Sequence, residues 1–259
     1  MMNKNTSDLI NKNNLKMKRV AIIIPSRIGS TRLSRKPLID IEGKPMLIWC
    51  AEQAKNSNSG DVYIACDCDE LAQLCEKYGY KYILTDPGIP TGSDRVYIAS
   101  KSLGDYEIIV NLQGDMPKIK PSTIKLTVDA LLNDSDREFD IMSAITTFSD
   151  EAEKADVNNV SAIVSHVGLN EVQPGDVMNS LYFTRTSHPY PQSVYKHIGI
   201  YGYRAEALEK FVSLPQSRLE IEEKLEQLRA LENGLKIGCV FVNDHVISLD
   251  SPDDLKRLL

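Results

Sequence analysis

The polar residues that follow the first apolar run combine positive charge with small side chains. After residues 20–24 (VAIII), the segment 25–37 reads PSRIGSTRLSRKP and contains Arg27, Arg32, Arg35 and Lys36. Small residues between the basic ones let backbone N–H groups approach an anion, so the segment is suited to holding a polyphosphate. The alternative is a solvated basic loop. The phosphate-loop pattern GxxxxGK[ST] does not occur in this segment.

Two aspartates stand at positions that suit a divalent cation. Asp115 comes just after the apolar run 107–112 and follows Gly114, which permits a sharp turn. Asp250 also follows a strand-like stretch, and the fold could bring it to the same ion. Mg²⁺ prefers carboxylate, water and phosphate oxygens. The alternatives are an ordinary Asx turn at Asp115 and a helix start at Asp250, with Ser251 as the N-cap.

Strands and helices alternate through the first half of the chain. Apolar runs predict buried strands at 20–24, 61–65, 82–84 and 107–112, and a short strand and turn at 39–44. Helices are predicted at 45–55, 69–78, 93–103 and 121–132. This alternation indicates parallel βαβ units. Ligands bind outside the carboxyl ends of strands in such sheets, where the basic segment and Asp115 stand.

The second half of the chain is less regular. Strands are predicted at 141–147, 160–164, 181–184, 197–203 and 239–242, and helices from 205, over 219–233 and from 252. This pattern indicates a mixed or antiparallel extension of the sheet. The expected fold class is therefore α/β, with three layers, a mostly parallel central sheet, a Rossmann-like nucleotide-binding half and a small mixed α+β lobe.

Composition narrows the classes of protein further. The 259 residues, 42% hydrophobic and 25% charged, fit one large α/β domain with a small lobe. The net charge of −6 gives no reason to expect a nucleic-acid partner, and no long apolar run predicts membrane insertion. Residues 1–18 are polar and lack the apolar core of a signal peptide, so a flexible extension and a cytoplasmic, reducing location are expected. The five cysteines are interpreted as small buried or half-buried thiols.

Several segments match, in order, the motifs of one enzyme family. They are 24–38 (IPSRIGSTRLSRKPL), 43–46 (GKPM), 91–95 (TGSDR), 111–115 (NLQGD), 197–204 (HIGIYGYR), 225–229 (LEQLR) and 250–255 (DSPDDL). Together they resemble the 3-deoxy-manno-octulosonate cytidylyltransferases, or CMP-Kdo synthetases. The opening is shared with related nucleotidyltransferases, whereas 197–204 and 225–229 are more specific.

The resemblance implies a Mg²⁺-dependent transfer of CMP from CTP to the anomeric C2 hydroxyl of Kdo. Pyrophosphate is released, and the activated sugar supplies lipopolysaccharide assembly. It also implies a cytoplasmic homodimer of the nucleotide-diphospho-sugar transferase fold. Residues 19–259 would form a single nucleotidyltransferase domain, with a nucleotide-binding half at 19–135 and a sugar-binding and dimerisation half at 136–259.

The resemblance also implies roles for particular residues. Catalysis would depend on Arg27, Lys36, Asp115 and Asp250. Arg27, Arg32 and Lys36 would hold the triphosphate, Ser93 and Arg95 would lie near the nucleoside, and Asp115 and Asp250 would hold the metal. The sugar acid would be surrounded by Gln113, Arg185, His197, Tyr201, Glu226 and Gln227.

General chemistry agrees with these roles. The planar fork of Arg185 suits a sugar carboxylate, and no Cys or Ser stands out as a nucleophile. Without the motif, His197 would be interpreted as structural, and Glu226 and Gln227 as part of a solvated helix face. On a helix these two neighbours would point about 100° apart, which favours direct sugar contact by only one of them.

The chain departs from the family pattern at three places. Ser34 and Arg35 replace the usual Pro-Gly before the lysine, Met116 replaces an acidic residue, and the segment 186–196, with His188, is short. Arg35 is expected either to contact phosphate or to point to solvent.

Three other functions compete with Kdo activation. A cytidylyltransferase could use sialic acid or an amino-substituted Kdo analogue. A glycosyltransferase is favoured only by the DxD pattern of residues 67–69 (DCD), whose place before a helix suggests capping instead. A non-catalytic nucleotide-binding protein is disfavoured because Lys36, Asp115 and Asp250 are all present.

Overall fold

The apolar runs of the sequence form the strands of a central sheet. The computed structural model describes residues 19–29, 33–168, 171–186 and 193–258. Arg32, His188 and the predicted extension 1–18 lie outside these ranges. Within them, no helix has the length and apolar character needed to cross a membrane. The strands are β1 (Val20–Ser26), β2 (Asp40–Ile41), β3 (Lys44–Pro45), β4 (Asp61–Cys66), β5 (Lys81–Leu84), β6 (Ile108–Leu112), β7 (Ile141–Thr146), β8 (Ser161–Val164), β9 (Val177–Thr184), β10 (Val194–Arg204) and β11 (Ile237–Phe241).

Helices connect most of these strands. They are α1 (Met46–Asn56), α2 (Asp69–Tyr78), α3 (Gly92–Lys101), α4 (Pro121–Asn133), α5 (Glu151–Ala155), α6 (Ala205–Ser213), α7 (Arg218–Glu223), α8 (Gln227–Glu232) and α9 (Pro252–Leu258). A single 3₁₀ turn, η1, covers Lys36–Leu38. The predicted helices at 69–78 and 121–132 are confirmed to within one residue, and α5 was not predicted.

The main sheet has the strand order β5-β4-β1-β6-β10-β7-β11-β9-β8 in the described part of the chain. The first four strands pair in parallel. Strand β10 runs antiparallel to both β6 and β7, and β11 is parallel to β7. Strands β9 and β8 add antiparallel pairs at the far edge. The predicted parallel sheet therefore holds for the first half, and the mixed extension holds for the second. Only β10 and β9 run against the other strands of this sheet in the described part of the chain.

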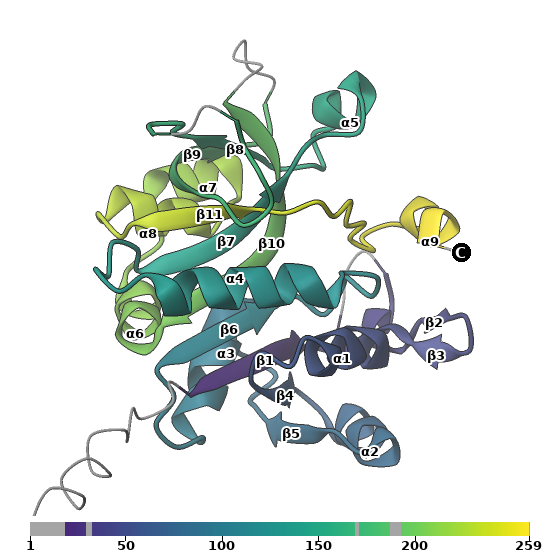
Figure 1. Cartoon of the computed structure of the whole chain (residues 1–259). Coiled ribbons are helices and arrows are strands. Elements are labelled where there is room, and N and C mark those ends of the chain that lie inside the picture. Colours follow the sequence, from purple (N-terminus) through teal and green to yellow (C-terminus); the bar gives the residue numbers. More distant parts are fainter. Residues whose placement is uncertain (1–18, 30–32, 169–170, 187–192, 259) are drawn as a thin grey trace, which may run out of the picture.

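Helices cover both faces of the sheet, so the fold has three layers (Figure 1). Side chains alternate along β1: Ile22 and Ile24 pack with α1, α2 and α4, whereas Ala21 and Ile23 pack with α3, α6 and α8. This alternation explains why the run VAIII is apolar throughout. Four of the five cysteines are buried and Cys68 is half-buried, all as free thiols, which confirms that prediction.

The directions of the strands bring three polar segments to one edge of the sheet. Because β10 opposes both β6 and β7, strands β1, β6 and β11 share one direction. Their carboxyl ends lead into the basic segment, Asp115 and the stretch before Asp250. A small apolar cluster of Ile41, Met46, Leu249 and Leu258 joins the β2–β3 hairpin to α9 beside this edge (Figure 1).

The largest local difference from the sequence prediction lies at residues 219–233. One continuous helix was predicted, but the structure has α7 and α8, separated at Lys224. Lys224 has a φ of 58°, a left-handed conformation that ends α7. Glu226 therefore lies at the N-cap of α8 rather than inside a helix, and the argument from a 100° separation does not apply.

Candidate active site

Lys36 joins the two predicted metal-binding aspartates. Its Nζ lies 2.8 Å from Asp115 Oδ2 and 3.0 Å from Asp250 Oδ1. A backbone hydrogen bond also joins the segments that carry the two aspartates, because the N–H of Leu249 donates to the carbonyl of Asp115 at 2.9 Å. Burial lowers the pKa of Lys36, but the two carboxylates outweigh it and the net pKa is raised. Lys36 therefore keeps a full positive charge between them.

Asp250 also stands beside a helix cap, as the alternative interpretation expected. Ser251 Oγ accepts the N–H of Asp254, and the Asp254 carboxylate accepts the backbone N–H groups of Asp250 and Ser251. These bonds leave the Asp250 carboxylate directed at Lys36. The same turn therefore caps α9 and directs the Asp250 carboxylate at Lys36.

The donor set around Lys36 fits a magnesium ion. Two carboxylates converge on one cationic group, and Mg²⁺ is commonly held by one or two carboxylates together with water and substrate phosphates. Among the described residues, no group of three or more His, Cys, Asp or Glu side chains could form a metal cage. The predicted role of Asp115 and Asp250 as metal ligands therefore fits their positions and stays a prediction.

A cavity of about 310 Å³ lies next to these carboxylates at the end of β1. Its lining includes the predicted nucleotide residues Arg27, Lys36 and Arg95. Arg95 is buried, its Nη1 donates to Thr85, and its Nη2 has no hydrogen-bond partner within the described residues. The buried Ser26 Oγ has none there either. Buried polar groups without partners are rare, and both of these belong to residues that line the cavity.

Asp67 has a role that the sequence did not predict. Its carboxylate accepts the backbone N–H of Ile28 at 3.1 and 3.2 Å, across 39 residues of sequence. Helix α2 begins after Cys68, without a side-chain cap. Capping by this DxD segment is therefore wrong, because Asp67 holds the start of the basic segment against the sheet.

A second cavity, of about 470 Å³, adjoins the first. It is lined by all six of the predicted sugar-binding residues, namely Gln113, Arg185, His197, Tyr201, Glu226 and Gln227. Both cavities share Gly92, Gln113, Asp115, Glu226 and Asp250. The two carboxylates that suit a metal therefore stand at the boundary between the cavities.

His197 is buried in an aromatic layer on β10. Its ring lies 5.0 Å from Phe183 and 5.5 Å from Tyr201 between centroids, and its Nε2 is 2.8 Å from Ser143 Oγ. Burial, and then the nearby charge of Arg185, lowers the pKa of His197 to about 3. The imidazole is therefore neutral at physiological pH.

Tyr201 lies beyond an irregularity in β10. The pairing with β7 shifts register between Ile198 and Tyr201, which is typical of a β-bulge that re-aims side chains. Both His197 and Tyr201 line the larger cavity. Burial, followed by the neighbouring Tyr203 and Glu226, raises the pKa of Tyr201 well above its usual value. Its phenol therefore stays protonated, as a neutral hydrogen-bonding group.

Arg185 is engaged with a loop at the rim of the larger cavity. Its Nη1 donates to the carbonyls of Val157 and Asn158, at 3.2 and 2.8 Å, and its backbone N–H donates to Glu223. The guanidinium lines the cavity while it holds this loop. Its predicted pairing with a sugar carboxylate stays a prediction.

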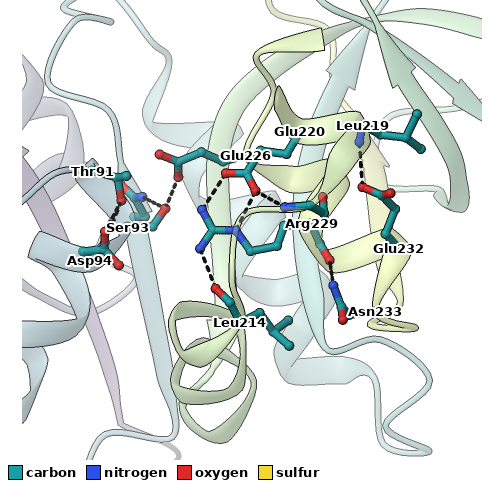
Figure 2. Close-up of polar contacts among 12 residues, drawn as sticks. Thr91, Ser93, Asp94, Leu214, Leu219, Glu220, Glu226, Arg229, Glu232 and Asn233 are labelled. Atoms are coloured by element: carbon teal, nitrogen blue, oxygen red, sulfur yellow. Dashed lines mark hydrogen bonds and ion pairs between the residues drawn. The ribbon is translucent and has the colours of Figure 1, made fainter. Parts of the chain in front are cut away.

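Ser93 lines the larger cavity and contacts Glu226, which lines both cavities. Ser93, at the start of α3, donates from Oγ to Glu226 Oε2 at 2.7 Å (Figure 2). Burial raises the pKa of Glu226, although Ser93 and Arg229 oppose that shift. Ser93 was predicted to lie near the nucleoside, and its bond to a predicted sugar residue was not foreseen. Gln227 is buried at the first residue of α8.

A buried ion pair between Arg229 and Glu220 holds the corner between α7 and α8. Arg229 donates from Nε and Nη2 to Glu220 at 2.8 and 2.6 Å (Figure 2). Its guanidinium lies 4.8 Å from the centre of the Phe211 ring. The last residue of the LEQLR segment is thus structural. The pair fixes the corner that carries Glu226 and Gln227.

Lys196 is a residue of the site that the sequence did not predict. Lys196 lines the larger cavity, forms an ion pair with Glu153 on α5, and donates to the carbonyl of Val246 at 3.2 Å. It therefore ties α5 to the chain that leads to Asp250. Its position beside His197 in the sequence was the one signal available.

Arg35 and Met116, which depart from the family pattern, have defined neighbours in the structure. Arg35 has a φ of 54°, and its side chain pairs with Glu70 on α2. The Arg35 side chain is exposed and the pair lies at the surface, which agrees with the alternative that it points to solvent. Met116 is buried in the main apolar cluster, where an acidic side chain would need a partner.

Comparisons with known proteins agree with this geometry. A sequence model described as Cytidylyltransferase matches residues 21–237. The chain is 42% identical over 248 residues to the 3-deoxy-manno-octulosonate cytidylyltransferase of a Bradyrhizobium strain, covering 93% of this chain and 97% of the relative. The same enzyme of Rickettsia typhi is 41% identical over 249 residues, covering 95% and 98%.

Solved structures show the same likeness. A structure of CMP:2-keto-3-deoxy-manno-octonic acid synthetase complexed with CTP matches with a TM-score of 0.82 and 31% identity, covering 93% of this chain and 96% of that one. A 4-diphosphocytidyl-2C-methyl-D-erythritol synthase from Anaerococcus prevotii matches at 0.61 with 14% identity, which speaks for the fold alone. On the family model and these full-length relatives, the chain belongs to the 3-deoxy-manno-octulosonate cytidylyltransferase family.

Proposed function

We propose that this protein transfers CMP from CTP to the anomeric hydroxyl of Kdo and releases pyrophosphate. The observation that carries the proposal is the convergence of Lys36, Asp115 and Asp250 at the boundary of two adjoining cavities. One cavity suits a nucleotide and the other a sugar acid. The product would be an activated sugar for lipopolysaccharide synthesis, and the relatives described above carry the matching name.

The smaller cavity would hold CTP. Arg27 and Lys36 would bind the triphosphate, together with Arg32, and would stabilise the charge that gathers on the leaving pyrophosphate. Arg95 and Ser93 would lie near the nucleoside. The partnerless Nη2 of Arg95 and Oγ of Ser26 support a polar nucleoside in this cavity.

Asp115 and Asp250 would hold the magnesium. When bound, this ion would lower the pKa of the attacking hydroxyl and offset the negative charge of the phosphates. Positioning of the two substrates in line would supply much of the remaining rate enhancement. Lys36 would then exchange its contacts with the aspartates, in part, for contacts with phosphate.

The larger cavity would hold the sugar acid. Arg185 would pair with its carboxylate, while the neutral His197 and Tyr201 would hydrogen-bond its hydroxyl groups. Glu226 and Gln227, at the corner between α7 and α8, would complete the set with Gln113.

The protein would act as a cytoplasmic homodimer through its second half, residues 136–259. Large apolar side chains of this half are exposed, among them Leu181 on β9 at 56% and Ile221 on α7 at 60%. Light scattering should give twice the chain mass for the native protein and one chain mass for Leu181→Lys. A monomeric native protein would contradict this part of the proposal.

Pyrophosphate release from CTP with Mg²⁺ tests the enzyme function. The assay should compare Kdo, its amino-substituted analogue and sialic acid, and Kdo should give the highest kcat/KM. Asp115→Asn should lose turnover by about 100-fold or more, because metal polarisation is worth several kcal/mol. The matched control is Asp129→Asn, whose carboxylate pairs with Lys125 on the exposed side of α4. No release with any of the acids would refute the proposal.

A further inference from the structure

A polar side chain stands in the middle of a fully buried strand. Asn111 belongs to β6, where every residue is buried, and it is 1% exposed. A buried carboxamide is costly unless its donors and acceptors find partners. Asn111 lies on the same face of the strand as Gln113, and its partners lead toward the two cavities.

These partners form a hydrogen-bond chain across three elements. Gln113 Nε2 donates to Asn111 Oδ1 at 3.1 Å, Asn111 Nδ2 donates to Ser93 Oγ at 3.4 Å, and Ser93 Oγ donates to Glu226 at 2.7 Å. The last link is drawn in Figure 2. The chain thus runs from the end of β6, through the start of α3, to the N-cap of α8.

The direction of the chain follows from its carboxylate end. The Ser93 hydroxyl donates its single proton to Glu226 Oε2 at 2.7 Å. The Ser93 oxygen then accepts from the Asn111 amino group, which turns the Asn111 oxygen toward Gln113. Gln113 must therefore use its amino group on Asn111, and its Oε1 is left for the cavities.

This orientation has a consequence for binding. Gln113 and Glu226 line both cavities, and Gln113 Oε1 lies beside Gly92, which lines both as well. The shared wall therefore presents acceptor oxygens, which suit the hydroxyl groups of a polyhydroxylated sugar. A reversed Gln113 amide would present a donor to these groups instead.

We propose that Asn111 and Ser93 are positioning residues that hold the Gln113 amide with its oxygen toward the hydroxyl groups of the bound sugar acid. The same chain keeps Glu226 in place on the opposite side. This inference rests on the proposed function for its substrate. The orientation of the amide itself does not depend on turnover.

Kinetics with matched variants test the inference. Asn111→Leu and Ser93→Ala should each raise the KM for Kdo roughly tenfold, the equivalent of one lost hydrogen bond. In Asn111→Leu, the CTP dissociation constant, measured without sugar, should change less than twofold. Ser93→Thr, which keeps the hydroxyl, should stay near the native KM. The double variant should raise the KM for Kdo no more than the single variant with the larger effect, because both changes break the same hydrogen-bond chain.

The control is Ser100→Ala, a change of the same kind on α3, whose hydroxyl bonds to the carbonyl of Tyr97. It should leave both constants unchanged. An unchanged KM for Kdo in Ser93→Ala and Asn111→Leu would overturn the inference. So would an equal rise in the CTP dissociation constant of Asn111→Leu, or a failure of Ser93→Thr to keep the KM near the native value.

A measurement without turnover separates this inference from the proposed function. In ¹⁵N spectra of the substrate-free protein, the side-chain amide protons of Gln113 should exchange slowly with solvent and should exchange at least tenfold faster in Asn111→Leu. If the native protein does not use Kdo but this protection is present, the proposed function fails and the chain stands. Equal exchange in both proteins would overturn the chain, whatever the activity.

Discussion

The ammonium group of Lys36 lies 2.8 Å from the carboxylate of Asp115, although the two residues are 79 positions apart. Asp250 approaches the same ammonium from the stretch between β11 and α9. A cation thus already occupies the position where two carboxylates would otherwise repel each other. A divalent ion held by the two aspartates would meet the same pair of negative charges.

Replacing Lys36 with Ala should therefore have two measurable effects. The kcat/KM for CTP should fall by roughly 10- to 100-fold, because a charge-assisted hydrogen bond to phosphate is lost. Mg²⁺ should raise the melting temperature of the variant more than that of the native protein, because the ion replaces the missing positive charge. Thermal unfolding with and without Mg²⁺ measures the second effect. Lys125→Ala, on the exposed side of α4, is the control, and an equal Mg²⁺ response in both variants would contradict the prediction.

The conformation of Arg35 predicts a difference between two substitutions. With φ at 54°, this residue occupies the left-handed region that glycine adopts without strain. Arg35→Gly and Arg35→Ala both lose the pair with Glu70, so comparing them isolates the backbone. The glycine variant should be more stable than the alanine variant by about 1 kcal/mol in urea unfolding. Equal stabilities would mean that the left-handed conformation costs nothing here.

The sequence predicted the positions of Lys36 and Asp115 at the edge of the sheet better than it predicted the position of Asp250. Buried strands followed by polar turns are local patterns, and they correctly placed Lys36 and Asp115 at neighbouring strand ends. Asp250 reaches Lys36 from 214 residues away, and the strand-like stretch before it was only a weak local signal, which the family resemblance strengthened.

The break between α7 and α8 shows a different limit. The charged run around Glu220 has helical periodicity, and neither Gly nor Pro marks its end. Lys224 nevertheless takes a left-handed conformation there, while the buried pair of Glu220 and Arg229 holds the two short helices together. Tertiary contacts thus overrode the local helical preference, and that is why the position of Glu226 could not be read from the sequence.

His197 predicts how stability depends on pH. Its pKa is about 3 in the folded protein, because of burial and of Arg185, compared with 6.5 for an ordinary histidine. Between these values the unfolded chain binds the proton more readily, so stability falls as pH falls below about 6.5. The expected loss from pH 7 to pH 5 is on the order of 2 kcal/mol. His197→Asn should flatten this dependence in urea unfolding, whereas His245→Asn, an exposed control, should keep it; an equally steep slope in both would contradict the prediction.

The pair of Arg229 and Glu220 predicts a large, non-additive effect on stability. Both side chains are buried, at 5% and 3% exposure, and their two hydrogen bonds compensate for the loss of hydration. Arg229→Met leaves the Glu220 carboxylate buried without its partner, which should cost about 3–5 kcal/mol. The double variant Arg229→Met with Glu220→Leu removes both charges and should recover much of that loss.

Urea unfolding of the single and double variants measures this coupling, and a double-mutant cycle separates it from the packing of the new side chains. Arg218→Met is the control, because Arg218 forms an exposed pair with Glu222 on α7 and its loss should change stability little. The corner between α7 and α8 carries Glu226 and Gln227, so the single variant should also raise the KM for Kdo more than the KM for CTP. If the double variant were as unstable as the sum of both single changes, the two charges would not be coupled, and the corner would owe its shape to other contacts.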